Sequence, residues 1–144
     1  MIRQANRFDK DAVIEMMLAF RDESPMAEIL QNDDPEHYHR LLDNILAGQG
    51  VIFLAEGAGL VMAMVAPSVW NAKVLVLHEL AWYVVPEKRD GTVGARLLKA
   101  YIDYAKALKE QGRIRYFTVT KMVTSPDFNY EKLGFRKVDE NWIQ

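Results

Sequence analysis

Cysteine is absent from this 144-residue sequence, and so are long uninterrupted apolar runs. Without cysteine the chain has no disulfides, no thiolate metal ligand and no cysteine nucleophile, which is compatible with a reducing compartment. No stretch approaches the roughly 18 apolar residues of a membrane helix, and residues 1–6 lack the apolar core of a signal peptide. We therefore expect a soluble, cytoplasmic protein that has no membrane partner.

A surplus of charge of one sign is missing as well, since the formal net charge is -2 at pH 7. Without a broad basic field the chain does not match a nucleic-acid-binding protein. Apolar residues make up 50% of the sequence, which is enough for one core, and the length is usual for one domain. We expect residues 1–144 to form a single domain without repeats, linkers or low-complexity segments.

Two helices are predicted in the N-terminal third of the chain. Asp9 stands where the first helix would be capped, and Phe8 and Val13 fall at the two positions of a hydrophobic staple. The second helix begins at Asp34, because a capping aspartate followed by Pro35 is typical of a first helical turn.

Two histidines, His37 and His39, lie in the first turn of the second helix. Residues two positions apart on a helix point about 200° away from each other, so these two cannot share a metal ion as an i,i+4 pair could. We expect them at the surface or at the rim of a substrate site. We predict no metal site in this chain.

Runs rich in β-forming residues begin at Val51. The runs at residues 51–56 and 60–67 are joined across Gly57-Ala58-Gly59, which predicts a hairpin. A further turn leads into a long run at residues 74–85. Most of the predicted sheet is therefore an antiparallel meander.

The strongest indication of function lies between Leu80 and Leu108. An apolar strand ends at Pro86, and a polar loop with two glycines and two cations, Lys88 and Arg89, leads into a long amphipathic helix. The first N–H groups of a helix lack intrahelical partners and carry the positive end of its dipole, so such a loop can bind an anion. We predict that it holds the diphosphate of a nucleotide-type cofactor. The alternative is a tight turn without a ligand.

The end of the chain predicts three more elements. Residues 114–120 alternate as a strand, and a strand–helix–strand crossover would place them parallel to residues 80–85. Ser125 would cap a last short helix that ends at Gly134, and a final short strand would include Trp142.

Two segments resemble the GCN5-related N-acetyltransferase (GNAT) superfamily. Residues 84–98, Val-Val-Pro-Glu-Lys-Arg-Asp-Gly-Thr-Val-Gly-Ala-Arg-Leu-Leu, are similar to its acetyl-CoA loop and following helix. Residues 130–135, Tyr-Glu-Lys-Leu-Gly-Phe, are similar to the sequence that closes its last helix. The resemblance implies an α/β (α+β) fold. Its sheet would be mixed and mostly antiparallel, with about four helices on both faces and a splayed parallel strand pair at the cofactor site.

The loop departs from the family pattern at one position. The signature Q/R-x-x-G-x-G/A falls on residues 89–94, so Thr92 replaces the first glycine while an additional glycine precedes it. The Cβ of Thr92 leaves a pyrophosphate less room to approach the backbone, but the Thr92 N–H can still donate a hydrogen bond to it. A second departure is that residues 123–129 lack the asparagine-led pattern often found there. The implied cofactor-binding residues, which hold the pantetheine arm and the pyrophosphate, are Val84, Val85, Arg89, Asp90, Gly91, Thr92, Val93, Gly94 and Ala95.

The family mechanism implied by the resemblance is direct attack of an amine on the thioester of acetyl-CoA, without a metal. A lysine-like amine with a pKa of about 10.4 is deprotonated in only about one molecule in 2500 at pH 7, so a base, or a water chain leading to one, would help. Glu79 is the first candidate, because burial inside an apolar strand would raise its pKa. His78 is the rival, since an imidazole ordinarily titrates near neutrality.

Strand alternation puts Glu79 and His78 on opposite faces, so at most one of them faces the thioester, and a bulge in this strand could reverse the choice. Tyr130 matches the family tyrosine that protonates the leaving thiolate. The structural alternatives are that Glu79 pairs with a cation, that His78 is a satisfied core residue and that Tyr130 only packs.

We therefore predict an acetyl-CoA-dependent N-acetyltransferase that acts on a primary amine of a small molecule or a protein. The alternatives are a catalytically silent acyl-CoA-binding or protein-interaction module on the same fold, and an adaptor that binds no cofactor. In the family fold the acceptor site would be built from residues 21–50, whose acids could attract a cationic amine, and from the turn near Trp70. A homodimer is left open.

Overall fold

The computed structural model describes residues 1–144 and builds them around one five-stranded sheet in which the strands are ordered as in the chain. β1 to β4 are antiparallel neighbours, and only β5 runs parallel to its neighbour β4. The predicted mixed, mostly antiparallel sheet is confirmed. The strands are β1 (Ile2–Gln4), β2 (Gly50–Ala55), β3 (Gly59–Pro67), β4 (Leu75–Val84) and β5 (Tyr116–Thr118).

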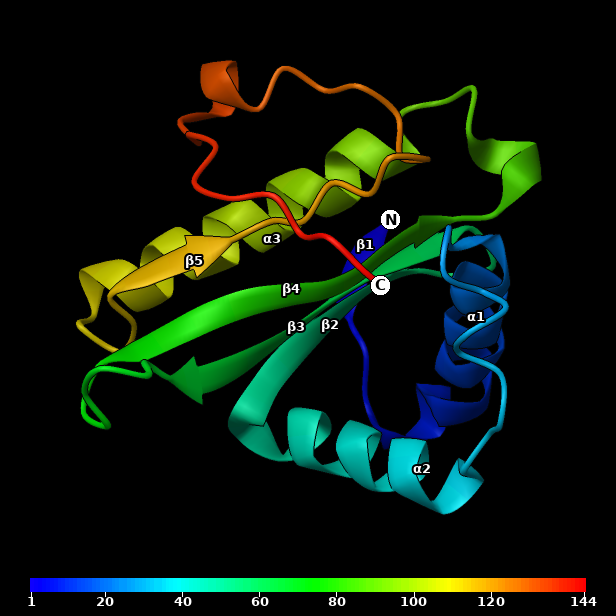
Figure 1. Cartoon of the computed structure of the whole chain (residues 1–144), viewed down its shortest axis with the longest axis horizontal. Helices are drawn as coiled ribbons and strands as arrows, with labels where there is room; N and C mark the ends of the chain where they lie inside the picture. The colour runs from blue at the N-terminus through cyan, green and yellow to red at the C-terminus, as the bar shows by residue number, and fades with distance from the viewer.

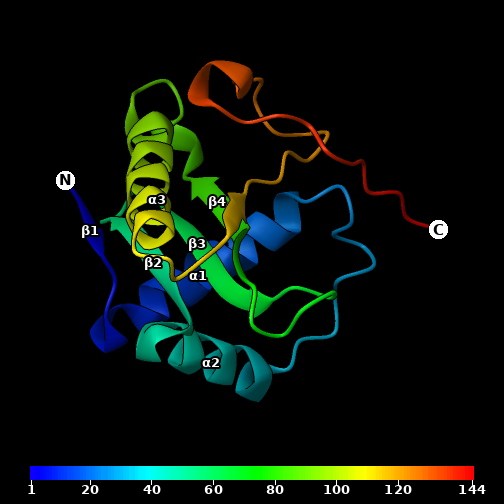
Figure 2. The ribbon, with the colours of Figure 1, turned by 90° about the vertical axis from the view of Figure 1, so that its left-hand side faces the viewer.

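Helices cover both faces of the sheet. Figure 1 and Figure 2 show α1 (Lys10–Glu23) and α2 (Pro35–Asn44) on one side and α3 (Val93–Glu110) on the other. The structure has three α-helices, and the remaining helical segments are single turns. None of the helices is both long enough and apolar enough to cross a bilayer.

The central strands are buried on both faces, which explains their nearly continuous apolar sequence. Side chains of one parity, such as Ile52 and Leu54, join a core with α1 and α2. Those of the other parity, such as Phe53 and Val61, join a core with α3 that includes the fully buried Tyr101. The sheet therefore separates two hydrophobic layers.

The entry into α1 differs from the prediction. Asn6 caps a preceding turn (Arg7–Asp9) by accepting a hydrogen bond from the Phe8 N–H at 2.9 Å. The Asp9 carboxylate accepts from the Asn6 N–H at 2.8 Å and makes no capping bond to α1. Phe8 is 82% exposed, so the predicted staple with Val13 is wrong. Asn6 and Asp9 instead form a reciprocal capping box on the preceding turn, which pairs the N–H groups of Asn6 and Phe8.

The next predicted boundaries are confirmed. The Asp34 side chain accepts from the His37 N–H at 3.3 Å and caps α2, and the helical chain ends at Gly48 with a φ of 116°. The hairpin between β2 and β3 turns at Gly57, which has a φ of 69°. Both glycines occupy backbone conformations that other residues rarely adopt.

The parallel crossover is confirmed, but its predicted register is wrong. Tyr116, Phe117 and Thr118 pair with Val76, Leu77 and His78, and not with residues 80–85. Figure 1 shows β5 alongside α3 and leaving β4 before the end of that strand. The second half of β4 therefore has an unpaired edge.

Side chains replace the missing strand partners where β4 and β5 separate. Tyr101 donates its hydroxyl to the Thr118 carbonyl at 2.6 Å. The main chain of Thr120 lies close enough to Glu79 to lower the pKa of its carboxyl slightly. Leu80 is the extra residue of a β-bulge, because Ala81 and Glu79 pair with adjacent residues of β3. The Tyr101 hydroxyl therefore satisfies one backbone group of β5 at the point where the two strands part.

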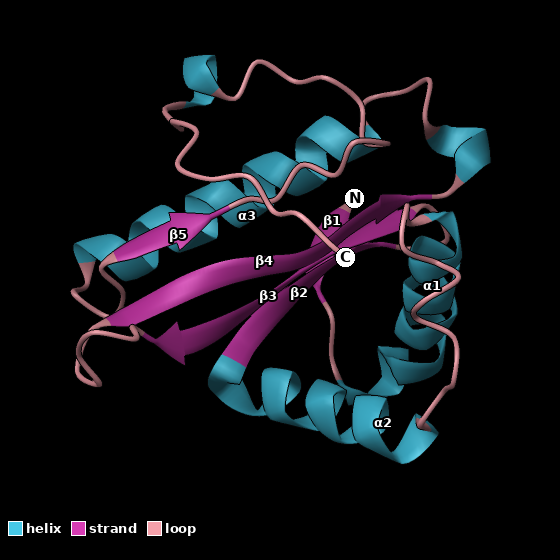
Figure 3. Cartoon of the chain, in the orientation of Figure 1, coloured by secondary structure: helices cyan, strands magenta, loops and turns pink.

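The C-terminal prediction fails in two places. Figure 3 shows the chain after β5 as loop except for one short turn, Glu131–Leu133. No helix starts at Ser125, because its hydroxyl accepts from the preceding Met122 N–H. Trp142 is 84% exposed and forms no strand. The glycine cap is confirmed, since Gly134 has a φ of 92° and donates to the Glu131 carbonyl.

The bond between Tyr101 and Thr118 predicts a stability difference between two tyrosines of α3. Tyr101→Phe leaves the Thr118 carbonyl without this donor and should lower the free energy of unfolding by about 1–3 kcal/mol. Tyr104→Phe is the matched control, because Tyr104 packs edge-on against Phe53 and its hydroxyl makes no protein hydrogen bond. Urea unfolding followed by circular dichroism measures both, and equal effects would contradict this role of Tyr101.

Candidate active site

The loop between β4 and α3 presents a row of free main-chain donors. After the turn at Pro86–Lys88, α3 begins at Val93, and the preceding Thr92 makes no side-chain cap. The first backbone bond of the helix runs from the Arg96 N–H to the Thr92 carbonyl at 2.9 Å. The N–H groups of residues 92–95 therefore donate no hydrogen bond within the protein. Together with the helix dipole, they form a favourable place for an anion.

Other loop residues that were predicted to bind the cofactor are already engaged. The Arg89 N–H donates to the Pro86 carbonyl at 3.3 Å, and the Gly91 N–H donates to the Lys88 carbonyl at 3.4 Å. The Arg89 side chain bonds Glu23 of α1 at 2.6 Å. The guanidinium of Arg89 thus links the loop to α1.

The two valines at the end of β4 differ in what they offer a ligand. The Val85 N–H donates to the Ala58 carbonyl at 2.8 Å, and its own carbonyl accepts from Lys88 at 2.9 Å. Because neighbouring strand residues alternate, the N–H and carbonyl of Val84 point to the other edge, toward β5. That carbonyl accepts from Arg89 Nε at 2.8 Å, which leaves the Val84 N–H facing the unpaired edge.

Glu79 lies at the point where β4 and β5 part. It pairs with Ala63, which belongs to the core under α3, so its side chain lies on the α3 face. Its residue surface is 8% exposed, and burial raises the pKa of its carboxyl to about 8, against a smaller lowering by the Thr120 backbone. Both Glu79 and Trp82 lie on this face, because the bulge at Leu80 shifts the alternation.

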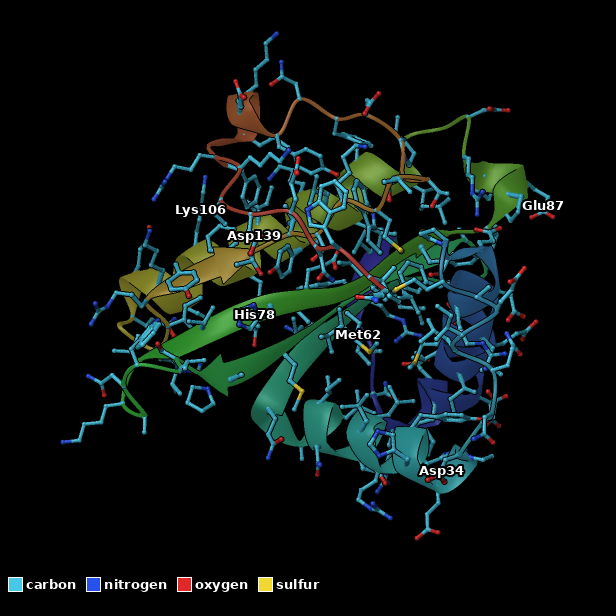
Figure 4. The ribbon with its side chains drawn as sticks, in the orientation of Figure 1. Asp34, Met62, His78, Glu87, Lys106 and Asp139 are labelled. Atoms are coloured by element: carbon cyan, nitrogen blue, oxygen red, sulfur yellow. The ribbon has the colours of Figure 1, made fainter.

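His78 lies on the opposite face of β4. Its Nδ1 is 3.1 Å from the Thr118 hydroxyl, and the side chain is half-buried. Figure 4 shows His78 in the middle of β4, well separated from Glu87 on the loop that leads to α3. The structure thus brings Glu79, and not His78, to the face that carries α3.

Tyr130 contributes a buried hydroxyl without a hydrogen-bond partner. Burial raises the pKa of its phenol most, and the charges of Glu79 and Asp127 raise it further. Its ring follows Phe128 in an aromatic row, with centroids 6.3 Å apart, and Phe128 lies 5.1 Å from Trp82. A second orphan donor in this row is the indole nitrogen of Trp82. Unpaired buried polar atoms are rare, and here two of them lie beside the same gap.

The acids that could attract a cationic amine are largely neutralised. Arg21 bonds Asp22 and Asp33, and Arg89 bonds Glu23. Asp34 caps α2, as described above. A cavity of about 330 Å³ lies between α1, α2 and their connection, and Met17, Leu18 and Leu30 are among its apolar lining residues.

Sequence reasoning missed two functional positions. Tyr101 falls in the apolar stripe of its helix, and a tyrosine that faces a sheet needs a partner for its hydroxyl. Trp82 lies in an apolar strand, and its indole N–H raises the same question. In both cases the polar atom of an amphipathic aromatic was the available signal.

Comparison with known proteins agrees with this geometry. The sequence model of the acetyltransferase (GNAT) family matches residues 13–135. The chain belongs to the GNAT family. The predicted resemblance is therefore confirmed, and it extends over most of this GNAT protein. No curated protein matches its sequence.

Solved structures share the fold of this GNAT chain. A transcriptional regulator from Bacillus halodurans C-125 is 18% identical with a TM-score of 0.70, covering 100% of this chain and 97% of that one. A predicted acetyltransferase from Clostridium acetobutylicum, solved with acetyl-CoA, is 18% identical with a TM-score of 0.66 and coverages of 100% and 94%. An aminoglycoside acetyltransferase from an uncultured soil metagenomic sample, in complex with trehalose, is 14% identical with a TM-score of 0.63 and coverages of 100% and 95%.

The buried carboxyl of Glu79 predicts a specific dependence of stability on pH. Its folded pKa of about 8 lies above the ordinary value of 4.5, so its contribution to stability is fully present below about pH 4.5 and is lost as pH rises through 8. The total change is on the order of 5 kcal/mol. Urea unfolding between about pH 5 and pH 8 should show this slope in the wild type and not in Glu79→Gln.

The control for this measurement is Glu110→Gln. Glu110 is exposed at the end of α3 and forms no ion pair, so its replacement should leave the pH slope as it is in the wild type. Parallel slopes for the wild type and Glu79→Gln would show that the carboxyl is not buried as described.

Proposed function

We propose that residues 1–144 form a single acyl-CoA N-acyltransferase domain that moves an acetyl group from acetyl-CoA to a primary amine of a small molecule or a protein. One observation carries the proposal: the free N–H row of residues 92–95 follows the part of β4 that β5 leaves unpaired, and Glu79 on that strand is close enough to Tyr130 to raise its pKa. An anion site next to a buried base and a buried donor is what thioester aminolysis requires.

The residues present fit acetyl-CoA. The N–H groups of residues 92–95 would hold the pyrophosphate, and the Val84 N–H would bind the pantetheine arm. Lys88 and Arg96 form no ion pair in the protein, so their charges are available to a phosphate. When bound, acetyl-CoA supplies the activated thioester. The acetyl-CoA complex of the structural relative from Clostridium acetobutylicum supports this choice of co-substrate.

Glu79 is the proposed base, because its side chain and α3 share a face of the sheet. With a pKa of about 8 it takes a proton from an amine more readily than an ordinary carboxylate does. At pH 7 its deprotonation costs only about 1.4 kcal/mol. His78 stays the rival through a water chain, although it lies on the other face and beside Thr118.

Tyr130 is the proposed donor to the leaving sulfur. Burial keeps its phenol protonated, so the hydroxyl can hydrogen-bond a developing thiolate without first losing its own proton. The hydroxyl makes no hydrogen bond within the protein that would have to be broken first. The cavity lined by Met17 and Leu30 between α1 and α2 offers an apolar wall for the carbon chain of an acceptor.

A proline variant tests the N–H row. Ala95→Pro removes one free donor in the first turn of α3, where a missing N–H costs no intrahelical bond. The apo protein should melt as the wild type does, whereas affinity for acetyl-CoA should fall about 10- to 100-fold. Isothermal titration and thermal shift measure both. Wild-type affinity in this variant would exclude the Ala95 N–H from the site.

Two substitutions test the chemistry. Glu79→Gln and Tyr130→Phe should each lower kcat about a hundredfold with little change in acetyl-CoA affinity, because they remove the base and the thiolate donor. Tyr116→Phe, on the exposed edge of β5, is the control and should be active. Turnover over a panel of amines, followed by release of free thiol, measures all three.

The same measurement separates the second candidate function. A catalytically silent acyl-CoA-binding or protein-interaction module on this fold is favoured by Thr92, whose Cβ stands where the family signature has glycine. Tight binding of acetyl-CoA without turnover over a broad panel of amines would support that module. Absence of any thermal shift with acetyl-CoA would instead support an adaptor without a cofactor, since a ligand at about 100 times its Kd adds about 2.7 kcal/mol.

A further inference from the structure

Trp82 has a hydrogen-bond donor with nothing to bind. Its indole nitrogen is buried and makes no hydrogen bond, whereas nearly all buried donors in folded proteins are paired. Packing alone does not explain the residue, because a phenylalanine would fill an apolar site without burying an N–H. The other two tryptophans, Trp70 and Trp142, are 92% and 84% exposed and raise no such question.

The indole lies beside the free N–H row of α3. A Cβ built on Gly94 would stand 3.7 Å from Cζ2 of Trp82 and 4.0 Å from Nε1, so the N–H edge of the ring abuts the first turn of the helix. These are ordinary van der Waals distances, so the ring and the first turn of α3 are in direct contact. The indole N–H and the N–H groups of residues 92–95 are therefore neighbouring donors that lack protein acceptors.

The rest of the ring is held in place. Trp82 pairs with Val61 across the sheet, and Phe128 packs against it with ring centroids 5.1 Å apart. Phe128 in turn contacts Tyr130, the proposed donor to the sulfur. The ring of Trp82 is thus fixed between the N–H row of residues 92–95 and the end of the site that holds Tyr130. Its free indole N–H is positioned to contact a ligand that reaches from one to the other.

We propose that the Trp82 indole N–H donates a hydrogen bond to an oxygen of the bound acyl-CoA. The inference rests on the proposed function and adds a binding residue to it. The acceptor is an oxygen of the pyrophosphate or an amide carbonyl of the pantetheine arm, since both are oxygen acceptors that would pass this point. Trp82 acts in binding and positioning, and no proton is transferred.

One consequence separates this role from packing. Trp82→Phe removes an unsatisfied donor, so the apo protein should melt at or above the wild-type temperature, while affinity for CoA should fall about tenfold. A purely structural tryptophan would give the reverse, with a lower melting temperature and unchanged affinity. Trp70→Phe is the matched control and should change neither quantity.

A spectroscopic test uses Trp82 itself and does not require that residue to be replaced. In a Trp70→Phe, Trp142→Phe double variant, Trp82 is the only indole, so ¹⁵N labelling gives one indole N–H cross peak. Saturating CoA should move this peak downfield and slow its exchange with water. ADP and pantetheine, added separately, identify the acceptor: a shift with ADP indicates the pyrophosphate, and a shift with pantetheine indicates an amide carbonyl.

The failures of the two proposals are distinguishable. If CoA raises the melting temperature but leaves the indole peak in place, the role of Trp82 is overturned and the proposed function stands. If CoA gives no thermal shift at all, both are overturned. A downfield shift together with the loss of affinity in Trp82→Phe supports the hydrogen bond.

Discussion

The separation of β4 from β5 is the constraint on which the rest of the structure depends. Two parallel strands would normally continue their ladder, because an unpaired backbone inside a protein is costly. Here the Tyr101 hydroxyl donates to the Thr118 carbonyl, and the Thr120 main chain lies close enough to Glu79 to lower the pKa of its carboxyl. These contacts come from α3 and from β4 itself. They support the end of β5, while the edge of β4 beyond His78 stays unpaired.

The same gap accounts for the unusual electrostatics of the site. Glu79 is buried among groups that do not neutralise it, so its pKa rises to about 8. Tyr130 and Trp82 each bury a donor that no protein group accepts. Each of these features costs folding stability, and each would have a use in the acyl-CoA site that we propose. Unsatisfied groups collected in one place are better explained by a ligand than by imperfect packing.

Sequence patterns predicted the caps and turns correctly where the hydrogen bonds that form them lie within one short segment. Asp34 before a proline, Gly57 in the hairpin and Gly134 after the last turn act through bonds to near neighbours, and all three behave as predicted. Prediction failed where a stronger partner was available elsewhere. Asp9 bonds the Asn6 N–H and Arg3 instead of capping α1. Trp142 is exposed, and the chain around it pairs with no strand of the sheet.

The order of elements up to β5, the family and the segment that exposes N–H groups could all be predicted from the sequence, because periodicity, capping and glycine positions act over a few residues. Residue type and motif also pointed to Glu79, His78 and Tyr130 as candidates. That Glu79 and not His78 lies on the face of α3 follows from the folded sheet, because a bulge at Leu80 sets the alternation. Contacts between residues distant in the chain likewise decide which N–H groups stay free. The same contacts place the indole N–H of Trp82 beside them.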